Sequence, residues 1–501
     1  MTRYSPKSPQ HKPPADRRSF GAAQFNATSK EVYPEPALAI EPETGCIWPE
    51  PFTYRPPPRR LDKLPALTYI DTVESRSPLL HDARRRLADS LGPGLITGAA
   101  DDDPSGLATY SQAGAQFGAG LLWTMAFTTP LMIGIQLVSA RIGWLTGQGL
   151  AASIRRFLPA WVTVGVVTLL VFANTLNIAA DIAAMGEALQ LLVGGPKHGH
   201  ALLFGLLSTA LPLWLGFDGM VRVLKWLTLA LLSYVAVVFM LHVNWEVVLG
   251  ESLVPRLEHG GAYWTMVVAV LGTTISPYLF FWQAAQEAEQ RQRLGADAEA
   301  SRDIAPGSRF VQEHLYRIKL DTSVGMVFSN LIAFCVMLAT ALTLHAHGIT
   351  DIQTTAQAAG ALRPLAGEFA FLLFSLGIIG TGMLAVPVLA ASSAYAVADA
   401  LQWRSGLDHK LFEARGFYAV IGFGTLVGTL VDFTSLDPIK ALVWSAVANG
   451  VIAVPIMAVM MWLGTKREVL GAYILSWRHR ILGWFATLVM GAAVAAMFFV
   501  G

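Results

Sequence analysis

Three consecutive carboxylates interrupt an apolar stretch of this sequence, and they are the residues best suited to chemistry. Asp101, Asp102 and Asp103 lie in GLITGAADDDPSGLATYSQAG, residues 94–114, which is otherwise apolar enough to cross a membrane. A single carboxylate at the centre of a membrane-spanning helix costs about 2.5–3.5 kcal/mol on insertion scales. Carboxylates in such a place indicate a polar site, and a cation is its natural guest.

A proline beside small polar residues follows the carboxylates, and the same arrangement recurs later in the chain. Residues 101–106 read DDDPSG, and residues 272–278 read GTTISPY. Proline removes a backbone donor and clashes with the carbonyl one turn earlier, so it frees polar groups that lipid cannot satisfy. Two such breaks at corresponding positions of two halves indicate an inverted-repeat transporter with its substrate site at the bilayer midplane.

Asp103 directly precedes Pro104, so its carboxylate should lie at the first break, where it can bind an ion. The alternative is that Asp103 only caps a helix beginning at Pro104, because Asp-Pro favours a helix start. Successive helical residues point about 100° apart, so the three aspartates cannot all converge on one ion. We expect at most one of Asp101 and Asp102 to join the site, while the other lines a water-filled approach or stays protonated.

The composition places these residues in a polytopic membrane protein. Of 501 residues, 53% are hydrophobic and only 14% are charged, which is too apolar for a soluble enzyme of this length. The net charge of +1, without a basic stripe, argues against a nucleic-acid partner. Cys46 and Cys335 provide neither metal-ligand spacing nor a disulfide framework.

Apolar stretches of membrane-spanning length recur about eleven times. They cover residues 91–117, 119–140, 161–193, 201–216, 222–243, 264–288, 320–344, 367–399, 416–434, 439–463 and 480–500. Together with the two breaks, they predict an all-α polytopic membrane protein with a LeuT-type inverted repeat, spans 1–5 and 6–10, and unwound first and sixth helices.

The ends of the chain are assigned from composition and charge. Residues 1–86 are rich in proline and charge and are predicted to form a disordered cytoplasmic tail, leaving residues 87–501 as the transmembrane transporter domain. Alternate loops carry most of the lysine and arginine, which predicts a multi-pass protein of the cell membrane with a cytoplasmic N-terminus. An odd number of spans then places the C-terminus outside.

Two motifs resemble those of the natural resistance-associated macrophage protein (Nramp) family of divalent metal transporters. One is GPGLITGAADDDPSGLATYSQAGAQFG, residues 92–118, where the family shows Asp-Pro-Gly-Asn; the other is QLVSARIGWLTGQGL, residues 136–150. The family pattern after the second span is matched by Gln136, Ala140, Arg141, Gly143, Thr146, Gly147 and Leu150. The resemblance implies a transporter, not an enzyme, that needs no cofactor and carries a divalent cation as its substrate.

The resemblance also implies a metal site, with departures from the family pattern. The family's metal-binding aspartate falls on Asp103, whereas its asparagine ligand falls on Gly106 and its sixth-span methionine on Ser276. Backbone carbonyl ligands would belong to Ala100 and Thr273, and Asp102 can complete the site.

These departures change the expected metal. A thioether favours softer ions, whereas hydroxyl, carbonyl and carboxylate oxygens suit hard cations, so the preference should shift towards Mg²⁺ or Mn²⁺. Gly106 and Ser276 are also expected to enlarge the cavity for a partly hydrated ion. The chain is thus similar to the Nramp-related magnesium transporter branch. The alternative is a proton-coupled Mn²⁺ or Fe²⁺ transporter of the ordinary Nramp type, its site completed by Asp102 or water.

Proton coupling is expected to be weak or absent. In the family, sixth-span histidines, third-span acids and ninth-span arginines form a proton route, and the histidine positions fall on Tyr278 and Gln283. Asp181 lies at or beside one acidic position, and Arg415 resembles one of the arginines. The resemblance leaves Tyr278, Asp181 and Arg415 along that route, with an Asp181–Arg415 ion pair as a structural tie and Glu187 as a substitute carboxylate.

Other functional classes remain as alternatives. A sodium-coupled carrier of an organic solute would share the architecture, but it should present a glycine-rich break rather than three aspartates to a substrate carboxylate. A channel or a metal sensor is a further alternative, whereas an intramembrane enzyme lacks both a His-Glu-x-x-His motif and a carboxylate pair. Asn330 and Asn449 are interpreted as interhelical hydrogen-bonding residues. The expected partners are the metal ion and the lipid bilayer, and the expected oligomeric state is a monomer.

Overall fold

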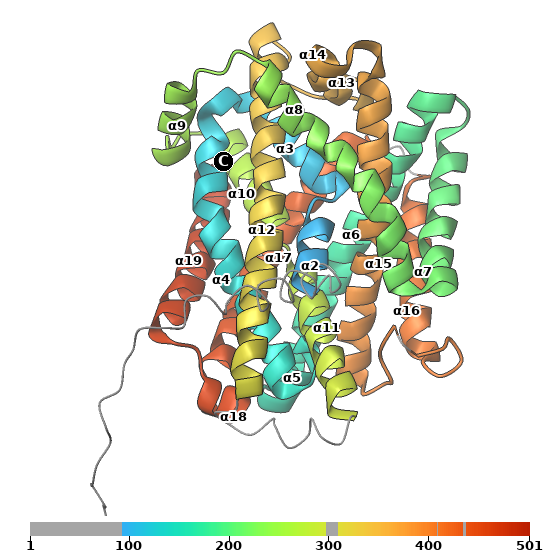
Figure 1. Ribbon diagram of the computed structural model, residues 1–501, viewed down its shortest axis with the longest axis vertical. Coiled ribbons are helices and arrows are strands. Elements are labelled where there is room, and N and C mark those ends of the chain that lie inside the picture. The colour runs from blue at the N-terminus through green and yellow to red at the C-terminus, as the bar shows by residue number, and fades with distance from the viewer. Residues whose placement is uncertain (1–92, 297–308, 408, 434–436, 501) are drawn as a thin grey trace, which may run out of the picture. The chain divides into compact units, whose positions relative to one another are not determined.

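The computed structural model describes residues 93–296, 309–407, 409–433 and 437–500, and every regular element in these ranges is a helix (Figure 1). The chain divides into two units, Met1–Glu74 and Ser75–Gly501, and the first lies wholly outside the described residues. The tail predicted for residues 1–86 falls outside them as well, so the following description concerns the helical part alone.

The α-helices of the first half and the sixth predicted span, in chain order, are α2 (Pro93–Asp101), α3 (Pro104–Phe117), α4 (Leu122–Thr146), α5 (Leu150–Phe157), α6 (Ala160–Val193), α7 (Lys197–Thr228), α8 (Leu232–Met240), α9 (Trp245–Leu253), α10 (Gly261–Thr274) and α11 (Pro277–Ala296). Those that follow are α12 (Arg309–Thr343), α13 (Thr355–Ala359), α14 (Arg363–Ala366), α15 (Ala370–Leu401), α16 (Arg415–Val431), α17 (Pro438–Gly464), α18 (Arg467–Leu470) and α19 (Trp477–Val500). Short 3₁₀ turns connect several of them: Gly118–Leu121, Leu229–Leu231, His345–His347, Gly360–Leu362, Gly367–Phe369 and Gly471–Tyr473.

Both predicted breaks are present. α2 ends at Asp101 and α3 begins at Pro104, and α10 ends at Thr274 while α11 begins at Pro277. Each proline occupies the start of the second helix, where its missing N–H has no helical partner to lose. The unwound first and sixth helices are therefore confirmed.

The number of spanning helices differs from the sequence expectation. Seven stretches of the described residues are long and apolar enough to cross a membrane, against about eleven predicted, and two shorter apolar helices cover Leu229–Met240 and Arg415–Val431. α3 and α4 merge into one stretch, Pro104–Thr146, because a 3₁₀ turn joins them without a loop. α7 continues through residues 217–221, so no loop separates the two spans predicted on either side of this segment.

The broken helices lie inside the bundle, surrounded by long unbroken ones. α12 packs against both α2 and α3 and runs the full height of the bundle in Figure 1. α6 packs against α15, and α10 packs against α17. Most side chains of α3, α10 and α15 are buried, so the first break is enclosed by protein rather than lipid.

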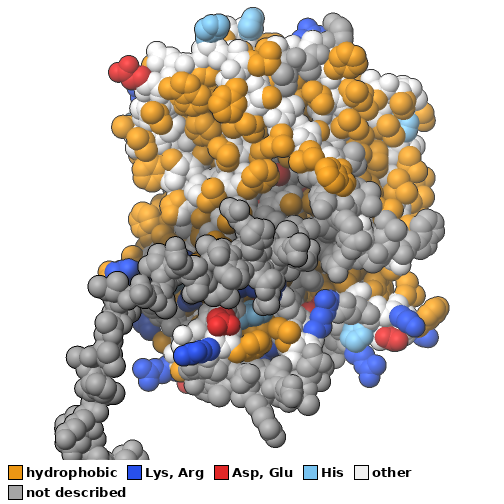
Figure 2. Space-filling model, viewed as in Figure 1, with side chains coloured by type: hydrophobic (Ala, Val, Ile, Leu, Met, Phe, Trp, Pro, Cys, Tyr) orange, Lys and Arg blue, Asp and Glu red, His pale blue; other side chains and the backbone are white. Residues whose placement is uncertain are grey.

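The surface separates apolar from basic side chains. In Figure 2, hydrophobic side chains cover the upper part of the visible face, and lysines and arginines gather towards the lower end. Arg155 and Arg156 lie in the last turn of α5, which Figure 1 places at that lower end. The positive-inside rule predicts that this end faces the cytoplasm. The placement of the N-terminus in the cytoplasm and the C-terminus outside stays a prediction.

Glycines allow the second broken helix to touch its neighbour. A Cβ on Gly272 of α10 would lie 2.1 Å from the carbonyl oxygen of Ala446 and 2.4 Å from the amide of Gly450, both on α17. Small residues at such contacts let membrane helices approach backbone to backbone.

The Gly272→Ala variant should destabilise this contact. The added methyl group meets backbone atoms that cannot rotate away, so we expect a loss of about 1–3 kcal/mol, seen as a lower melting temperature of the detergent-purified protein. Gly424→Ala is the control, because a Cβ on this helical glycine of α16 meets nothing within 4 Å. Equal melting temperatures for the two variants would contradict the close contact.

Candidate metal site

Asp103 lies between the halves of the first broken helix and uses its two carboxylate oxygens differently. As the N-cap residue of α3 it has φ −75° and ψ 169°, and its Oδ1 accepts the amide of Gly106 at 2.7 Å. Its Oδ2 accepts Nδ2 of Asn177 at 3.0 Å and lies 3.5 Å from the Tyr278 hydroxyl. The capping role that the sequence suggested is present, but it occupies one oxygen and leaves the other facing the neighbouring helices.

Asn177 is a site residue that the sequence analysis missed. Its Nδ2 donates to Asp103, and its Oδ1 accepts the hydroxyl of Ser445 from α17 at 2.7 Å. A signal was present, because Asn174, Asn177 and Asp181 recur at i, i+3 and i+7 and therefore share one face of α6. This face is buried, so its polar residues point into the bundle.

Tyr278 joins the two breaks. Its hydroxyl donates to the carbonyl oxygen of Ala100 at 2.8 Å, next to Asp103. The backbone carbonyl predicted as a metal ligand is thus hydrogen-bonded here by a residue of α11. Because a carbonyl oxygen has two lone pairs, the bond does not remove Ala100 as a donor to an ion.

The second break satisfies most of its own groups. The Ser276 hydroxyl lies 2.7 Å from the carbonyl oxygen of Thr273 and 3.1 Å from that of Gly272, the carbonyls that the break leaves without helical partners, and it can donate to either of them. The Ser276 oxygen keeps its lone pairs, because it acts here as a donor.

Thr273 contributes a side-chain oxygen that the sequence analysis did not predict. A Cβ on Gly106 would lie 2.9 Å from Thr273 Oγ1 and 3.4 Å from Asp103 Oδ1, so the two breaks face each other across this glycine. A side chain at residue 106 would crowd the Thr273 hydroxyl, and the expectation that Gly106 enlarges the cavity stays a prediction. The space that a side chain at residue 106 would take already borders a threonine hydroxyl.

Asp101 and Asp102 turn towards α12 instead of the second break. The Ser329 hydroxyl lies 2.7 Å from Asp101 Oδ2 and 3.0 Å from Asp102 Oδ1, and it can donate to only one of them at a time. Both carboxylates are buried, and Asp101 Oδ1 has no hydrogen-bond partner in the described ranges. The structure thus places Asp102 beside the site and attaches it to α12 through Ser329.

Several buried oxygens around the first break have no hydrogen-bond partner among the described residues. They are Asp101 Oδ1, Ser105 Oγ, Tyr110 OH, Thr273 Oγ1 and both carboxylate oxygens of Asp181. Unpartnered buried polar atoms are costly, and a bound ion or water is the usual reason that a protein keeps them. No three histidine, cysteine or acidic side chains of the described residues converge, so an ion here would also need hydroxyl and carbonyl donors. Such an all-oxygen set suits a hard divalent cation.

The predicted Asp181–Arg415 ion pair is wrong. Asp181 is buried within electrostatic range of Asp103, whereas Arg415 begins α16 on the surface, with its guanidinium 5.7 Å from the Phe412 ring centre. Glu187 is not a spare carboxylate, because it accepts the amide of Thr355 at 3.1 Å at the start of α13. Asp181 therefore faces the site without an arginine partner among the described residues.

Amide side chains replace a family histidine farther along α11. Gln136 Nε2 donates to Gln283 Oε1 at 2.7 Å, and Gln283 Nε2 donates to Thr322 Oγ1 at 2.8 Å. Asn330 does form the predicted interhelical bonds, to Met125 and Thr129 of α4. Neither side-chain atom of Asn449 has a hydrogen-bond partner in the part of the chain that the structure describes, so its predicted interhelical bond is not formed.

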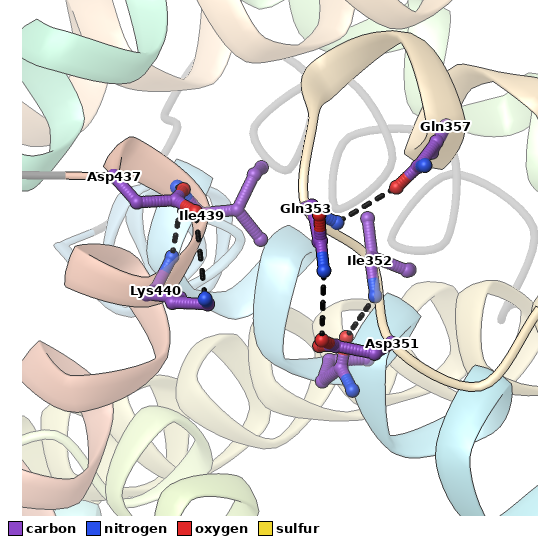
Figure 3. Close-up of polar contacts among 8 residues, drawn as sticks. Asp351, Ile352, Gln353, Gln357, Asp437, Ile439 and Lys440 are labelled. Atoms are coloured by element: carbon purple, nitrogen blue, oxygen red, sulfur yellow. Dashed lines mark hydrogen bonds and ion pairs between the residues drawn. The ribbon is translucent and has the colours of Figure 1, made fainter.

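Polar contacts near α13 and α17 serve the backbone rather than an ion (Figure 3). The amide of Ile352 donates to Gln112 Oε1 at 2.9 Å, and the amide of Gln353 donates to Gln357 Oε1 at 2.8 Å. The Asp437 carboxylate accepts amides in the first turn of α17 at 3.1 and 3.4 Å. These side chains cap helices and hold loops.

Comparisons with known proteins agree with this arrangement. The family model described as natural resistance-associated macrophage protein-like matches residues 94–500. A protein from Verminephrobacter eiseniae named divalent metal cation transporter MntH is 27% identical over 441 residues, covering 83% of this chain and 90% of that protein. The crystal structure of the Eremococcus coleocola manganese transporter superposes with a TM-score of 0.65 at 15% identity, covering 83% of this chain and 88% of that one. MhsT in complex with L-phenylalanine superposes with a TM-score of 0.53 at 12% identity, covering 81% and 98% of the two chains. These neighbours confirm the LeuT-type fold.

Thr273→Val should weaken metal binding without weakening the fold. The substitution keeps the side-chain shape and removes a hydroxyl that makes no well-formed hydrogen bond and interacts only weakly with the buried Tyr110 hydroxyl, so little protein–protein bonding is lost. We expect the Mn²⁺ dissociation constant of the purified protein to rise about tenfold, and its melting temperature without metal to stay unchanged.

Thr274→Val is the matched control for this substitution. Its hydroxyl donates to the carbonyl oxygen of Val270 at 3.0 Å, within its own helix. This variant should bind Mn²⁺ as the wild type does. Unchanged binding by Thr273→Val would exclude its hydroxyl as an ion ligand.

Proposed function

The chain belongs to the Nramp family, and from this membership and the oxygen-lined break we propose that it transports hard divalent metal cations across the cell membrane. The single observation that carries this proposal is the set of buried, unpartnered oxygens around Asp103. Together with the Asp103 carboxylate they offer a cation negative charge and several donors, and they offer an organic anion only repulsion.

Mg²⁺ and Mn²⁺ are the proposed substrates. The donors near the two breaks are carboxylate, hydroxyl and carbonyl oxygens, and Ser276 occupies the position where the family resemblance places a methionine. Mg²⁺ keeps part of its water shell and needs few direct protein ligands, so Asp103 with one or two further oxygens suffices. The MntH relatives and the manganese transporter are named for divalent metal cations and manganese, which supports this class of substrate.

Alternating access is the proposed mechanism. In a LeuT-type fold the two broken helices meet at the site, and rocking of one bundle against the other exposes it to each side in turn. Tyr278 of α11 bonds to Ala100 of α2, and the two halves of each broken helix can move separately. We propose that the N-terminus is cytoplasmic, the C-terminus is outside and the chain acts as a monomer.

Weak or absent proton coupling follows from the side chains that line the expected route. Tyr278 and Gln283 do not gain a proton in the physiological range, and Arg415 lies on the surface away from Asp181. The main alternative, a proton-coupled Mn²⁺ carrier, would have to use Asp181 alone. A sodium-coupled carrier of an organic solute is the second alternative. The similarity to MhsT in complex with L-phenylalanine concerns the fold alone, and the aspartates at the break would repel a substrate carboxylate.

Metal flux in proteoliposomes tests the proposal. Wild type should show saturable uptake of Mg²⁺ and Mn²⁺ with no movement of protons, and Asp103→Ala should lower both rates at least 100-fold because it removes the carboxylate at the break. Asp351→Asn, which neutralises an exposed aspartate in the loop before α13, is the control and should transport normally. Uptake of Mn²⁺ but not Mg²⁺, driven by a pH gradient, would contradict this proposal and support the proton-coupled Mn²⁺ carrier instead.

Ser276→Met tests the basis of selectivity. A thioether next to the break favours softer ions, so Cd²⁺ uptake should rise and Mg²⁺ uptake should fall about tenfold or more in competition assays. Ser276→Ala controls for the lost hydrogen bonds to Gly272 and Thr273, and it should slow both metals without favouring Cd²⁺. An unchanged ratio of Cd²⁺ to Mg²⁺ uptake in Ser276→Met would remove Ser276 from the selectivity argument.

A further inference from the structure

Glu287 is a buried carboxylate that the proposed metal site does not use. It lies on α11, its side chain is 0% exposed, and Gln283 of the same helix interacts with its carboxylate, although neither oxygen accepts a well-formed hydrogen bond from the described residues. A carboxylate so weakly paired inside a bundle is expensive to keep and, in a membrane protein, is a functional residue by default.

The geometry of α11 connects Glu287 with the metal site. Ser276, Gln283 and Glu287 are separated by seven and four residues, so their directions on the helix differ by only about 20–40°. Eleven residues along a helix correspond to about 16 Å. Figure 1 shows α11 running from the centre of the bundle towards the lower, basic end. Glu287 therefore lies on the same face as Ser276, farther towards that end.

One polar side chain, Gln283, lies on this face between them. Gln283 bonds to Gln136 of α4 and to Thr322 of α12, so amides and a hydroxyl continue the polar face beyond Ser276. A Cβ on Gly94 would lie 2.6 Å from the amide nitrogen of Thr322, which shows that the first turn of α2 covers this region.

The charged groups that face Glu287 come from α12. Asp321 and Arg317 lie within electrostatic range of its carboxylate. Asp321 Oδ2 accepts the amide of Gly94 at 2.8 Å, and the Arg317 guanidinium donates to Gln290 at 2.8 and 3.2 Å when that amide is turned to receive it. Arg317 attracts the Glu287 carboxylate and Asp321 repels it, but no hydrogen bond from Arg317 to Glu287 forms within the described ranges, so the carboxylate oxygens keep their lone pairs for a cation.

We propose that Glu287 is a second cation station, which binds the divalent metal after it leaves Asp103 and before it leaves the basic end of the bundle. The inference rests on the proposed transport of divalent cations. The ion would bind Glu287 with part of its water shell, as Mg²⁺ does at sites with one or two carboxylates. Movement of α2 away from α12 would open the station to water.

Glu287→Gln tests the station by separating transport from binding at Asp103. The amide keeps the size of the side chain and removes its charge. We expect the maximal Mn²⁺ uptake rate in proteoliposomes to fall at least tenfold, while the Mn²⁺ dissociation constant measured in detergent stays within about threefold of wild type. Glu289→Gln is the matched control, because this residue lies on the next part of the same helix, accepts the Tyr395 hydroxyl at 2.6 Å and should transport normally.

Cysteine labelling gives a readout that a purely structural role would not move. In a chain carrying Cys46→Ser and Cys335→Ala, the Gln290→Cys variant, which places a thiol one turn from Glu287 and leaves that carboxylate in place, is treated with a membrane-impermeant cationic thiosulfonate. We expect labelling from the basic end only, and at least fivefold slower labelling when Mn²⁺ is present. If Glu287→Gln takes up Mn²⁺ slowly but Mn²⁺ does not change the labelling rate, the station is excluded. Mn²⁺ uptake by Glu287→Gln at the wild-type rate would also exclude it.

The two proposals fail in different ways. If wild type takes up no metal but Mn²⁺ still protects the cysteine, the transport proposal fails and the cation site stands. If wild type takes up Mn²⁺ and Asp103→Ala does not, while Mn²⁺ gives no protection of the cysteine at position 290, the station fails and the transport proposal stands.

Discussion

Backbone groups freed inside an apolar bundle must find polar partners, and the centre of this structure depends on that requirement. Two helices are broken at proline, and lipid cannot satisfy the exposed amides and carbonyls. Asp103 accepts the amide of Gly106, Ser276 donates to carbonyls at the end of α10, and Tyr278 donates to Ala100 across the two breaks. The breaks are stable because each supplies partners for itself or for the other.

The site consists of the oxygens that remain after this pairing. Asp103 keeps one oxygen directed at the neighbouring helices, while Thr273 and Asp181 carry buried oxygens without partners among the described residues. If every oxygen were hydrogen-bonded within the protein, none would be left to bind an ion. If none were hydrogen-bonded, the free-energy cost of burying them would be too high for the breaks to be stable. The incomplete satisfaction of a largely oxygen-lined centre is the physical basis for proposing a hard cation as its guest.

The close packing around α2 and α10 has a consequence for movement. Gly98 of α2 meets the backbone of Gly325 on α12, and Gly272 of α10 meets that of Gly450 on α17, so these contacts consist of backbone atoms with few interlocked side chains. Such surfaces can separate and re-form without repacking large side chains. α11 then carries two buried polar side chains, Gln283 and Glu287, from the break towards the basic end.

The sequence by itself determined the helical membrane class, both breaks, Asp103 as the carboxylate at the first of them and the family. These are local properties: hydropathy predicts a helix in lipid, and a proline beside small polar residues favours a break, whereas Pro130, Pro387 and Pro455 in apolar surroundings lie inside continuous helices. Only the tertiary structure decided the partners. Asn177 and Ser329 reach the aspartates from distant helices, Thr273 borders Gly106, and Arg415 lies far from the residue it was expected to pair with. The physical reason is that partners depend on how each helix is rotated and where it crosses its neighbours, which hydropathy and motif spacing do not specify.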